Sequence, residues 1–273
     1  MSRSTFLPIL LLALALPTSA NELAASDLTD DPKAREIMVM VDERDDGDMM
    51  TQKLEMVLID KNGNERVRQL SSYGRDVGED EQRIIFFMSP ADVKDTGFLT
   101  YDYDESERDD DQWLYLPALR KTKRIASSDK SGSFMGSDFS FADMTDFDLD
   151  KYAFKMLDDG EVRGEKVWKI ERTPLTREEI VERGYTKSVL FVRQDNYVVV
   201  RAVHWVKKGN KLKYLDIQKL EQIDGIWTPI EQTMTTKKGK KTLHKTILRF
   251  DDTKYNQELE ESIFTQRRLE KGV

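Results

Sequence analysis

Residues 111–144 read DQWLYLPALRKTKRIASSDKSGSFMGSDFSFADM and join two segments of opposite character. The first alternates aromatic residues, Trp113 and Tyr115, with leucines, which is the period of a β-strand. The second is a loop rich in Ser, Gly and Asp. It nevertheless carries five large apolar side chains, at Phe134, Met135, Phe139, Phe141 and Met144. Loops are normally exposed and polar, so these side chains need a burial partner. The stretch predicts either fixed core that fills a sheet or a movable lid over a cavity, and both remain open.

Strand-like segments continue on both sides of this stretch. Upstream, Leu54, Met56 and Leu58 alternate with charged or smaller residues. The Asn62-Gly63 pair that follows is typical of a hairpin turn. Further strands are predicted at 84–88, 98–103, 112–125, 152–157, 166–171, 188–193, 197–206, 211–222, 227–236 and 242–250. The predicted fold class is mainly β (α+β), with one strongly curved, unclosed antiparallel sheet. A few helices cannot fill the concave face of such a half-barrel densely, so we expect an apolar cavity there.

Three segments have helical periodicity. Apolar residues recur at helical spacing from Ala34 to Val41, after an Asp31 that suits a helix cap. Ile37 and Met38 lie on the apolar stripe of this helix, which must therefore face another part of the protein. The other two helices are predicted at 176–183 and 258–271. We expect the helices to cover the concave face of the sheet.

Four motifs give the chain a family resemblance. They are W-L-Y-L-P-A-L-R-K at 113–121, K-R-I at 123–125, S-F-M-G-S-D-F-S at 133–140 and F-M-S-P-A-D at 87–92. Together they resemble the periplasmic LolA-like family of outer-membrane lipoprotein-sorting proteins, over roughly residues 30–270. The chain is similar to the broader branch of this family rather than to the lipoprotein carrier itself.

The resemblance implies a LolA/LolB-like half-barrel of about eleven strands with helices in its mouth. It also implies a non-catalytic activity, in which a soluble shuttle or sensor shields acyl chains between two membranes. Members of the branch are often paired with inner-membrane exporters of the RND (MMPL-like) type, so such an exporter is the implied partner. The resemblance supplies no ligand-binding residues for this chain.

The first twenty residues read as a secretory signal peptide. Arg3 precedes the apolar run 6–16, and small residues end at Ala20, after which we expect cleavage. The run is too short to favour a membrane anchor. A single LolA-like domain is predicted for 21–273, and the expected location is the periplasm.

Composition excludes several function classes. The chain has no Cys and only two His, at 204 and 244, which excludes a disulfide framework and thiolate or His-rich metal sites. A net charge of −8 argues against a nucleic-acid partner. Neither His has an acid–nucleophile pattern nearby, and no Gly-rich phosphate loop precedes a helix. We therefore expect no enzyme activity, no cofactor and no metal.

Two charged surfaces have more than one interpretation. The acidic loop 102–111 lacks the spacing of an EF-hand, so a solvated hairpin tip is favoured over a Ca²⁺ site. Lysines gather at two hairpin tips, at Lys207, Lys208, Lys237 and Lys238. If the tips share one end of the sheet, they form a basic rim that could contact anionic headgroups or an acidic patch on a transporter. Lysines at strand ends also simply protect the edges.

The functional prediction is a periplasmic carrier that binds lipid or lipoprotein acyl chains in an apolar cavity. It would act with an inner-membrane RND-type exporter in transport towards the outer membrane. The alternatives are a regulatory or structural subunit of such an exporter, and a lipid or sugar hydrolase. One apolar volume is predicted to contain Ile37, Met38, Trp113, Leu116, Phe134, Met135, Phe139, Phe141 and Met144, with 127–144 as its gate.

Overall fold

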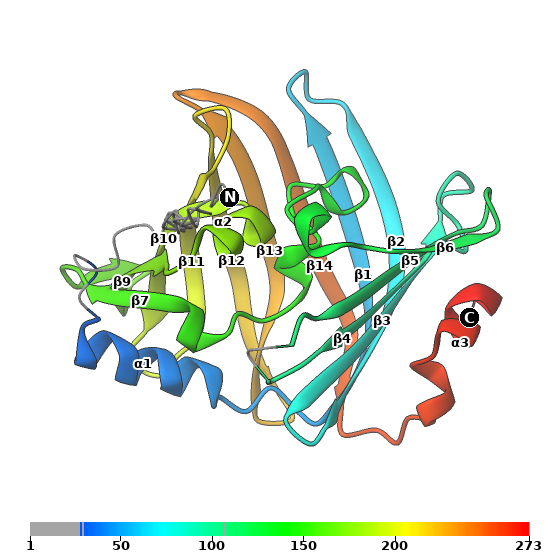
Figure 1. The fold of residues 1–273 in the computed structure, drawn as a ribbon, viewed down its shortest axis with the longest axis horizontal. Helices are drawn as coiled ribbons and strands as arrows, with labels where there is room; N and C mark the ends of the chain where they lie inside the picture. The colour runs from blue at the N-terminus through cyan, green and yellow to red at the C-terminus, as the bar shows by residue number, and fades with distance from the viewer. Residues whose placement is uncertain (1–27, 29, 106–107, 273) are drawn as a thin grey trace, which may run out of the picture.

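One large antiparallel sheet dominates the molecule (Figure 1). The computed structural model describes residue 28 and residues 30–105 and 108–272, so the predicted signal peptide lies outside the described residues. Fourteen strands form the sheet, which begins at β6, ends at β7 and does not close. The predicted fold class, a curved and unclosed antiparallel sheet, is confirmed. Among the described residues, no helix combines the length and apolar composition needed to cross a membrane.

The strands follow the chain mostly as a meander. The first seven are β1 Met49–Asp60, β2 Glu65–Val77, β3 Asp80–Ser89, β4 Gly97–Asp102, β5 Asp111–Leu116, β6 Lys121–Arg124 and β7 Tyr152–Met156. The other seven are β8 Gly160–Val162, β9 Glu165–Pro174, β10 Tyr185–Arg193, β11 Val199–Val206, β12 Leu212–Ile223, β13 Ile226–Lys238 and β14 Lys241–Tyr255. Their order in the sheet is β6-β5-β4-β3-β2-β1-β14-β13-β12-β11-β10-β9-β7, and β8 pairs with β9.

Two predicted elements differ from the structure. The strand predicted at 112–125 is a hairpin of β5 and β6, because Pro117 lacks an amide hydrogen and Arg120 turns the chain with φ +47°. The C-terminal helix predicted at 258–271 is much shorter: α3 spans Gln266–Lys271, after a 3₁₀ turn at Glu261–Ile263.

The other two helices form as predicted. In α1, Pro32–Asp42, the Asp31 carboxylate caps the first turn by accepting from the amides of Lys33 and Ala34. The Arg35 guanidinium then donates to the Tyr152 carbonyl at 2.7 Å, which ties α1 to β7. The second helix, α2, spans Arg177–Arg183.

Alternation along the strands separates two apolar faces. Phe87 packs in a cluster with Leu54, Met56 and Phe98, whereas its neighbour Phe86 packs in another cluster with Leu99 and Phe264. The cluster around Phe87 continues through Leu215 into a third one, which holds the buried residues of α1. These two connected clusters lie on the concave face, the side of the sheet on which Figure 1 shows α1 and the segment 127–144. The prediction that helices cover this face holds for α1, but it is wrong for α3, which packs on the opposite face through Leu269.

Candidate functional site

The concave face is covered by the segment 127–144, here called the plug. Three 3₁₀ turns give it shape, at Ser127–Asp129, Phe134–Gly136 and Ala142–Met144. Its own backbone closes it, because the Phe134 amide donates to the Phe139 carbonyl at 2.8 Å and the Phe141 amide to the Gly132 carbonyl at 3.0 Å. The plug is therefore a segment with its own hydrogen-bonded structure that packs against the sheet.

The aromatic side chains of the plug enter the sheet's apolar cluster. Phe134 is only 1% exposed, and its ring centroid lies 5.0 Å from that of Phe98 and 6.1 Å from that of Phe87. Phe141 meets Phe134 edge to face at 5.7 Å, a geometry that aromatic pairs favour. The apolar space that the sequence predicts above the concave face is occupied by these rings.

A buried carboxylate fastens the tip of the plug to two strands. Asp138, 4% exposed, accepts from the hydroxyls of Thr236 at 2.5 Å and Thr246 at 2.8 Å. It also lies 2.6 Å from Nδ1 of His244, while its amide donates to the Thr246 hydroxyl at 2.9 Å. Nearby, Arg68 donates to the Met135 carbonyl at 2.6 Å. These bonds join the tip to β2, β13 and β14 by groups that water can replace.

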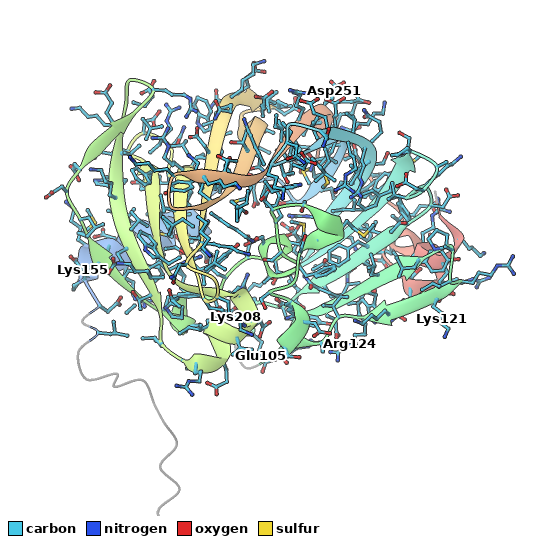
Figure 2. The ribbon with its side chains drawn as sticks, turned by 90° about the horizontal axis from the view of Figure 1, so that it is seen from above. Glu105, Lys121, Arg124, Lys155, Lys208 and Asp251 are labelled. Carbon is cyan, nitrogen blue, oxygen red and sulfur yellow. The ribbon has the colours of Figure 1, made fainter. Side chains whose placement is uncertain are left out.

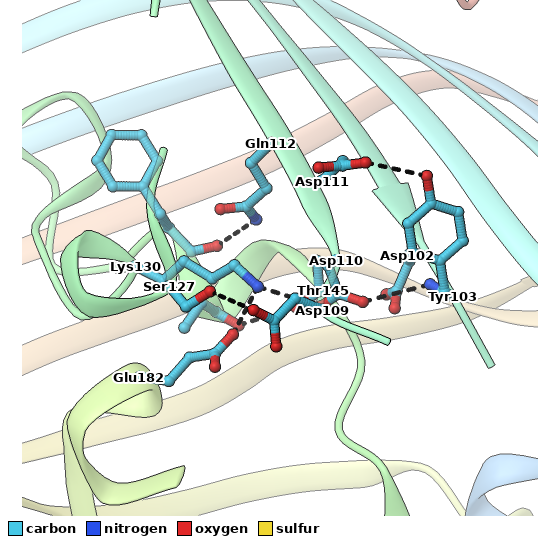
Figure 3. Close-up of polar contacts among 12 residues, drawn as sticks. Asp102, Tyr103, Asp109, Asp110, Asp111, Gln112, Ser127, Lys130, Thr145 and Glu182 are labelled. Atoms are coloured by element: carbon cyan, nitrogen blue, oxygen red, sulfur yellow. Dashed lines mark hydrogen bonds and ion pairs between the residues drawn. The ribbon is translucent and has the colours of Figure 1, made fainter. Parts of the chain in front are cut away.

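The base of the plug is held by a second polar network. Lys130 is 1% exposed and reaches Glu182 of α2 at 2.5 Å and Asp110 at 3.8 Å (Figure 3). The side-chain amide of Gln112, which is labelled in Figure 3, donates to the Phe141 carbonyl at 2.8 Å. Because a buried ammonium needs partners, Lys130 keeps the base of the plug beside α2.

Asp143 completes the base network on the other side. It accepts from the Tyr185 hydroxyl at 2.8 Å and lies 3.7 Å from Nζ of Lys213. Burial alone would raise its pKa, but Lys213 and the donated hydrogen bonds hold the pKa below its usual range. The plug is thus anchored through charged groups at its base and through Asp138 at its tip.

The predicted site residues fall into three clusters instead of one volume. Those on the plug, together with Leu116, share the concave cluster: Leu116, Phe134, Met135, Phe139, Phe141 and Met144. Ile37 and Met38 lie in the cluster beneath α1, which touches the first one through Leu215. Trp113 lies on the opposite face, beside Tyr101 and Phe264. Placing Trp113 in the same volume was wrong, because the strand period sends it away from Leu114.

A sizeable cavity among the described residues lies at another place and is acidic. It is a cleft of about 660 Å³ between the end of α1, the β2–β3 hairpin, the end of β4 and the segment 146–150. Eleven carboxylates and three arginines line it. This open space is therefore not the apolar cavity that the sequence predicts. The acidic loop 102–111 contributes Asp102 and Asp104 to it, so this part of the loop is not simply a solvated tip.

Crowding of carboxylates changes their proton affinity in the cleft. Burial, followed by the charges of Asp110 and Asp146, raises the pKa of Asp102 to about 8. Burial, with Asp46 next in importance, raises the pKa of Asp76 to about 6. Because Asp102 holds a proton at neutral pH, the cleft carries less negative charge than its composition suggests.

One group of carboxylates in the cleft has the spacing of a metal site. Oxygens of Glu81, Asp102 and Asp146 lie within 4.8 Å of one another. The Asp146 amide donates to Asp102 at 2.7 Å, and Arg83 donates to Glu81 at 2.6 Å. A proton on Asp102 and the guanidinium of Arg83 therefore already offset the charge that a cation would neutralise.

Both histidines have partners that the sequence did not reveal. His204 on β11 lies opposite Ser188 on β10, with 2.8 Å between Nδ1 and the hydroxyl oxygen. Burial lowers the pKa of His204 to about 3, so the ring stays neutral, and neither of the two cavities described reaches it. Because the His204 ring is buried and no ligand can reach it through these cavities, we assign it a structural role. The cross-strand pair could have been found from the register of β10 and β11, which the sequence alone does not fix.

The two lysine-bearing hairpin tips do share one end of the sheet. Leu212 on β12 pairs with Lys237 on β13, so the turn 207–211 and the turn 237–241 are neighbours. The Asp138 anchor lies just inside this end, because Lys238 follows Thr236 by two residues along β13. The acidic cleft lies at the opposite end of the same strands.

Comparison with known proteins places the chain in a family. A family model described as an uncharacterized protein matches residues 79–271. A solved domain from Vibrio parahaemolyticus, assigned as an outer membrane lipoprotein-sorting protein, is 32% identical with a TM-score of 0.78, covering 87% of this chain and 98% of that one. A DUF1329 family protein from Desulfovibrio piger is 30% identical with a TM-score of 0.79, covering 88% and 100%.

A more distant structure shares the fold. A LolA superfamily protein from Nitrosomonas europaea is 18% identical with a TM-score of 0.64, covering 86% of this chain and 98% of that one. None of the curated proteins matches the chain. The two neighbours at 30% identity or more extend over nearly their whole length, and they carry the assignment. The chain belongs to the family of outer-membrane lipoprotein-sorting domain proteins with the LolA-like fold.

Proposed function

We propose that the protein is a periplasmic carrier that binds acyl chains of lipids or lipoproteins on its concave face, beneath the plug. The observation that carries this proposal is the construction of the plug. Its apolar side chains occupy the concave cluster, while its backbone and charged groups hold it through hydrogen bonds. Family membership supports the same role, because the Vibrio relative is assigned to lipoprotein sorting.

The energetics of exchange favour an acyl chain as ligand. When the plug moves out, the sheet exposes the apolar surface around Phe87 and Phe98 that Phe134 had covered. Each methylene that an acyl chain buries contributes about 0.8 kcal/mol, so a chain of ordinary length can replace the contacts of two phenyl rings. No covalent chemistry is needed, and the proposed role is not that of an enzyme.

The proposal includes a membrane partner. A carrier between two membranes must receive its ligand from a protein or a bilayer, and the family resemblance implies an inner-membrane exporter of the RND or MMPL type. In this scheme the protein takes the acyl chain at the inner membrane and moves it towards the outer membrane.

A second candidate is a non-carrier subunit of such an exporter. The dense packing of Phe134, at 1% exposure, favours it, because a permanent plug would leave no room for a ligand. The two candidates differ in whether the plug opens while the sheet stays folded.

Lipid extraction followed by native mass spectrometry, on protein purified from periplasm, tests the proposal directly. The carrier predicts a co-purifying acyl lipid, and also binding of a fluorescent fatty-acyl probe that strengthens in a Phe134→Ser/Met135→Ser variant, because the plug then leaves the concave face more readily. Phe86→Ser is the matched control, because Phe86 is equally buried but faces α3. If the wild-type protein carries no lipid and binds no probe, the carrier function is excluded and the non-carrier subunit remains.

A further inference from the structure

The charges of the molecule are separated along its strands. One end carries the lysine rim, defined as the seven lysines in the turns 207–211 and 237–241. These two turns read KKGNK and KKGKK and contain no acidic residue. The other end carries the cleft lined by eleven carboxylates. Figure 1 shows the yellow and orange hairpins of the rim side by side at the end of the sheet away from α1.

Most of the rim lysines are available to an external partner, although the Lys207 ammonium donates to the Val181 carbonyl at 2.8 Å. Lys208, Lys238, Lys240 and Lys241 are exposed, and no ion pair is formed by any rim lysine within the described part of the chain. Figure 2 looks down on the end of the molecule that is uppermost in Figure 1, where the rim lies, and Lys208 is labelled there. Burial lowers the pKa of Lys207, and the nearby positive charge of Lys208 lowers it further. An anionic surface would relieve this repulsion.

The form of the rim favours a surface with diffuse charge. All of its cations are lysines, which act as point charges, whereas a stereospecific carboxylate or phosphate partner is better matched by arginine. The lysines lie on two hairpin turns, and none of them lines the acidic cleft or the smaller cavity beside Val162 and Ile217. A layer of anionic phospholipid headgroups has the matching charge without requiring a shaped pocket.

The rim also lies close to the anchored tip of the plug. Asp138 bonds to Thr236 and His244, and these residues lie two and three positions from the rim lysines Lys238 and Lys241. We infer that the lysine rim docks the protein on an anionic phospholipid bilayer with the plug's tip facing the membrane. The acidic end is repelled by the same surface and keeps this orientation. The orientation matters for ligand entry only if the proposed carrier function is correct.

Vesicle binding tests the docking. Wild-type protein should sediment with vesicles of phosphatidylcholine and phosphatidylglycerol, much less with phosphatidylcholine alone, and less as salt increases. Changing Lys208, Lys238, Lys240 and Lys241 to Gln should weaken partitioning roughly tenfold or more. The matched control changes four exposed lysines elsewhere, at Lys94, Lys121, Lys155 and Lys219, and should weaken it about threefold or less.

A fluorophore provides a second measurement that does not depend on lysine variants. Since the chain has no cysteine, Thr242→Cys and Glu79→Cys each give a unique labelling position, at the rim and at the acidic end. The emission of the rim label should shift to the blue on anionic vesicles, and that of the acidic-end label should not.

Equal losses in both lysine variants, or equal shifts of both labels, would overturn the docking orientation. If the wild-type protein binds an acidic protein but not anionic vesicles, the proposal that the rim's partner is a membrane would be overturned. The rim variant should still bind the fatty-acyl probe in solution. If neither protein binds the probe while vesicle docking persists, the carrier function fails and the docking stands.

Discussion

The concave cluster under the plug and the acidic cleft are two regions of one curved sheet that differ in packing and in chemistry. The first is apolar and filled, with Phe134 against Phe87 and Phe98. The second is open, about 660 Å³, and lined mainly by carboxylates. The open space therefore has the wrong chemistry for an acyl chain, and the space with the right chemistry is occupied. A carrier with this structure must open by moving a folded segment.

The two regions also differ in how their polar groups are satisfied. Beneath the plug, buried charges have partners of opposite sign or hydroxyl donors, as at Lys130 and Asp138. In the cleft, carboxylates face carboxylates, and Asp102 keeps a proton while it accepts a hydrogen bond from the Asp146 amide. The plug region is thus held by specific bonds, whereas the cleft depends on pH.

The largest expected effect comes from the aromatic contact of the plug. Phe134→Ala should favour the open plug by about 3–5 kcal/mol, which accelerates hydrogen exchange of the plug amides by roughly two to nearly four orders of magnitude. Strand amides in β12 and β13 should change much less. Phe86→Ala, on the opposite face, should instead lower the free energy of global unfolding. If Phe134→Ala accelerated plug and strand amides equally, the plug would be core, and the comparison between filled and movable space would fail.

The anchor at the tip should have the next largest effect. Asp138→Ala leaves the hydroxyls of Thr236 and Thr246 and the ring of His244 without their shared acceptor, at a cost of about 2–4 kcal/mol. Urea unfolding, with hydrogen exchange to locate the loss, measures it. Asp129→Ala is the control, because Asp129 is exposed on the same segment and should change stability by less than about 0.5 kcal/mol. Similar losses in both variants would show that Asp138 is no special anchor.

The cleft should respond to pH in the opposite sense from an ordinary salt bridge. The pKa of Asp102 is raised to about 8 in the folded protein, so the folded state binds more protons than the unfolded state between about pH 4 and 8. Its contribution to stability is therefore present at low pH and is lost as pH rises through this window. Asp102→Asn should stabilise the protein by about 1–2 kcal/mol at pH 8, after allowance for screening, and by almost nothing near pH 4.

Thermal or urea unfolding across this pH range checks the sign. A destabilised Asp102→Asn protein at pH 8 would mean that the carboxylate is needed in its charged form, as at a cation site. The hydrogen bond from the Asp146 amide can still be accepted by the Asn side-chain oxygen, so this variant isolates the charge.

Much of the fold could be predicted from the sequence because alternation and caps are local signals. Asp31 and Thr176 mark the starts of α1 and α2, and both helices form there. Local signals failed where a turn interrupts an apolar run, as at Pro117, and where a threonine cap begins a helix late, as Thr265 does for α3. The family motifs correctly indicated the half-barrel.

The site was only partly predictable. The large apolar residues of the loop 127–144 identified the plug. The hydrogen bonds that anchor the plug, however, join residues more than a hundred positions apart, as Asp138 and Thr246 are. The acidic cleft gathers α1, the β2–β3 hairpin, β4 and the segment 146–150, and no local pattern brings them together. Trp113 was placed on the wrong face because its aromatic character was given more weight than the strand period.

The central claim is that an acyl chain binds only when the plug leaves the concave face, and a reversible lock tests it most directly. The Asp138 amide nitrogen lies 2.9 Å from the Thr246 hydroxyl, so Cys at both positions should form a disulfide, and the chain offers no other thiols. Affinity for a fluorescent fatty-acyl probe is then measured before and after reduction of the same sample. The account predicts that the oxidised protein does not bind the probe and that reduction restores binding. Equal affinity in the two states would contradict it.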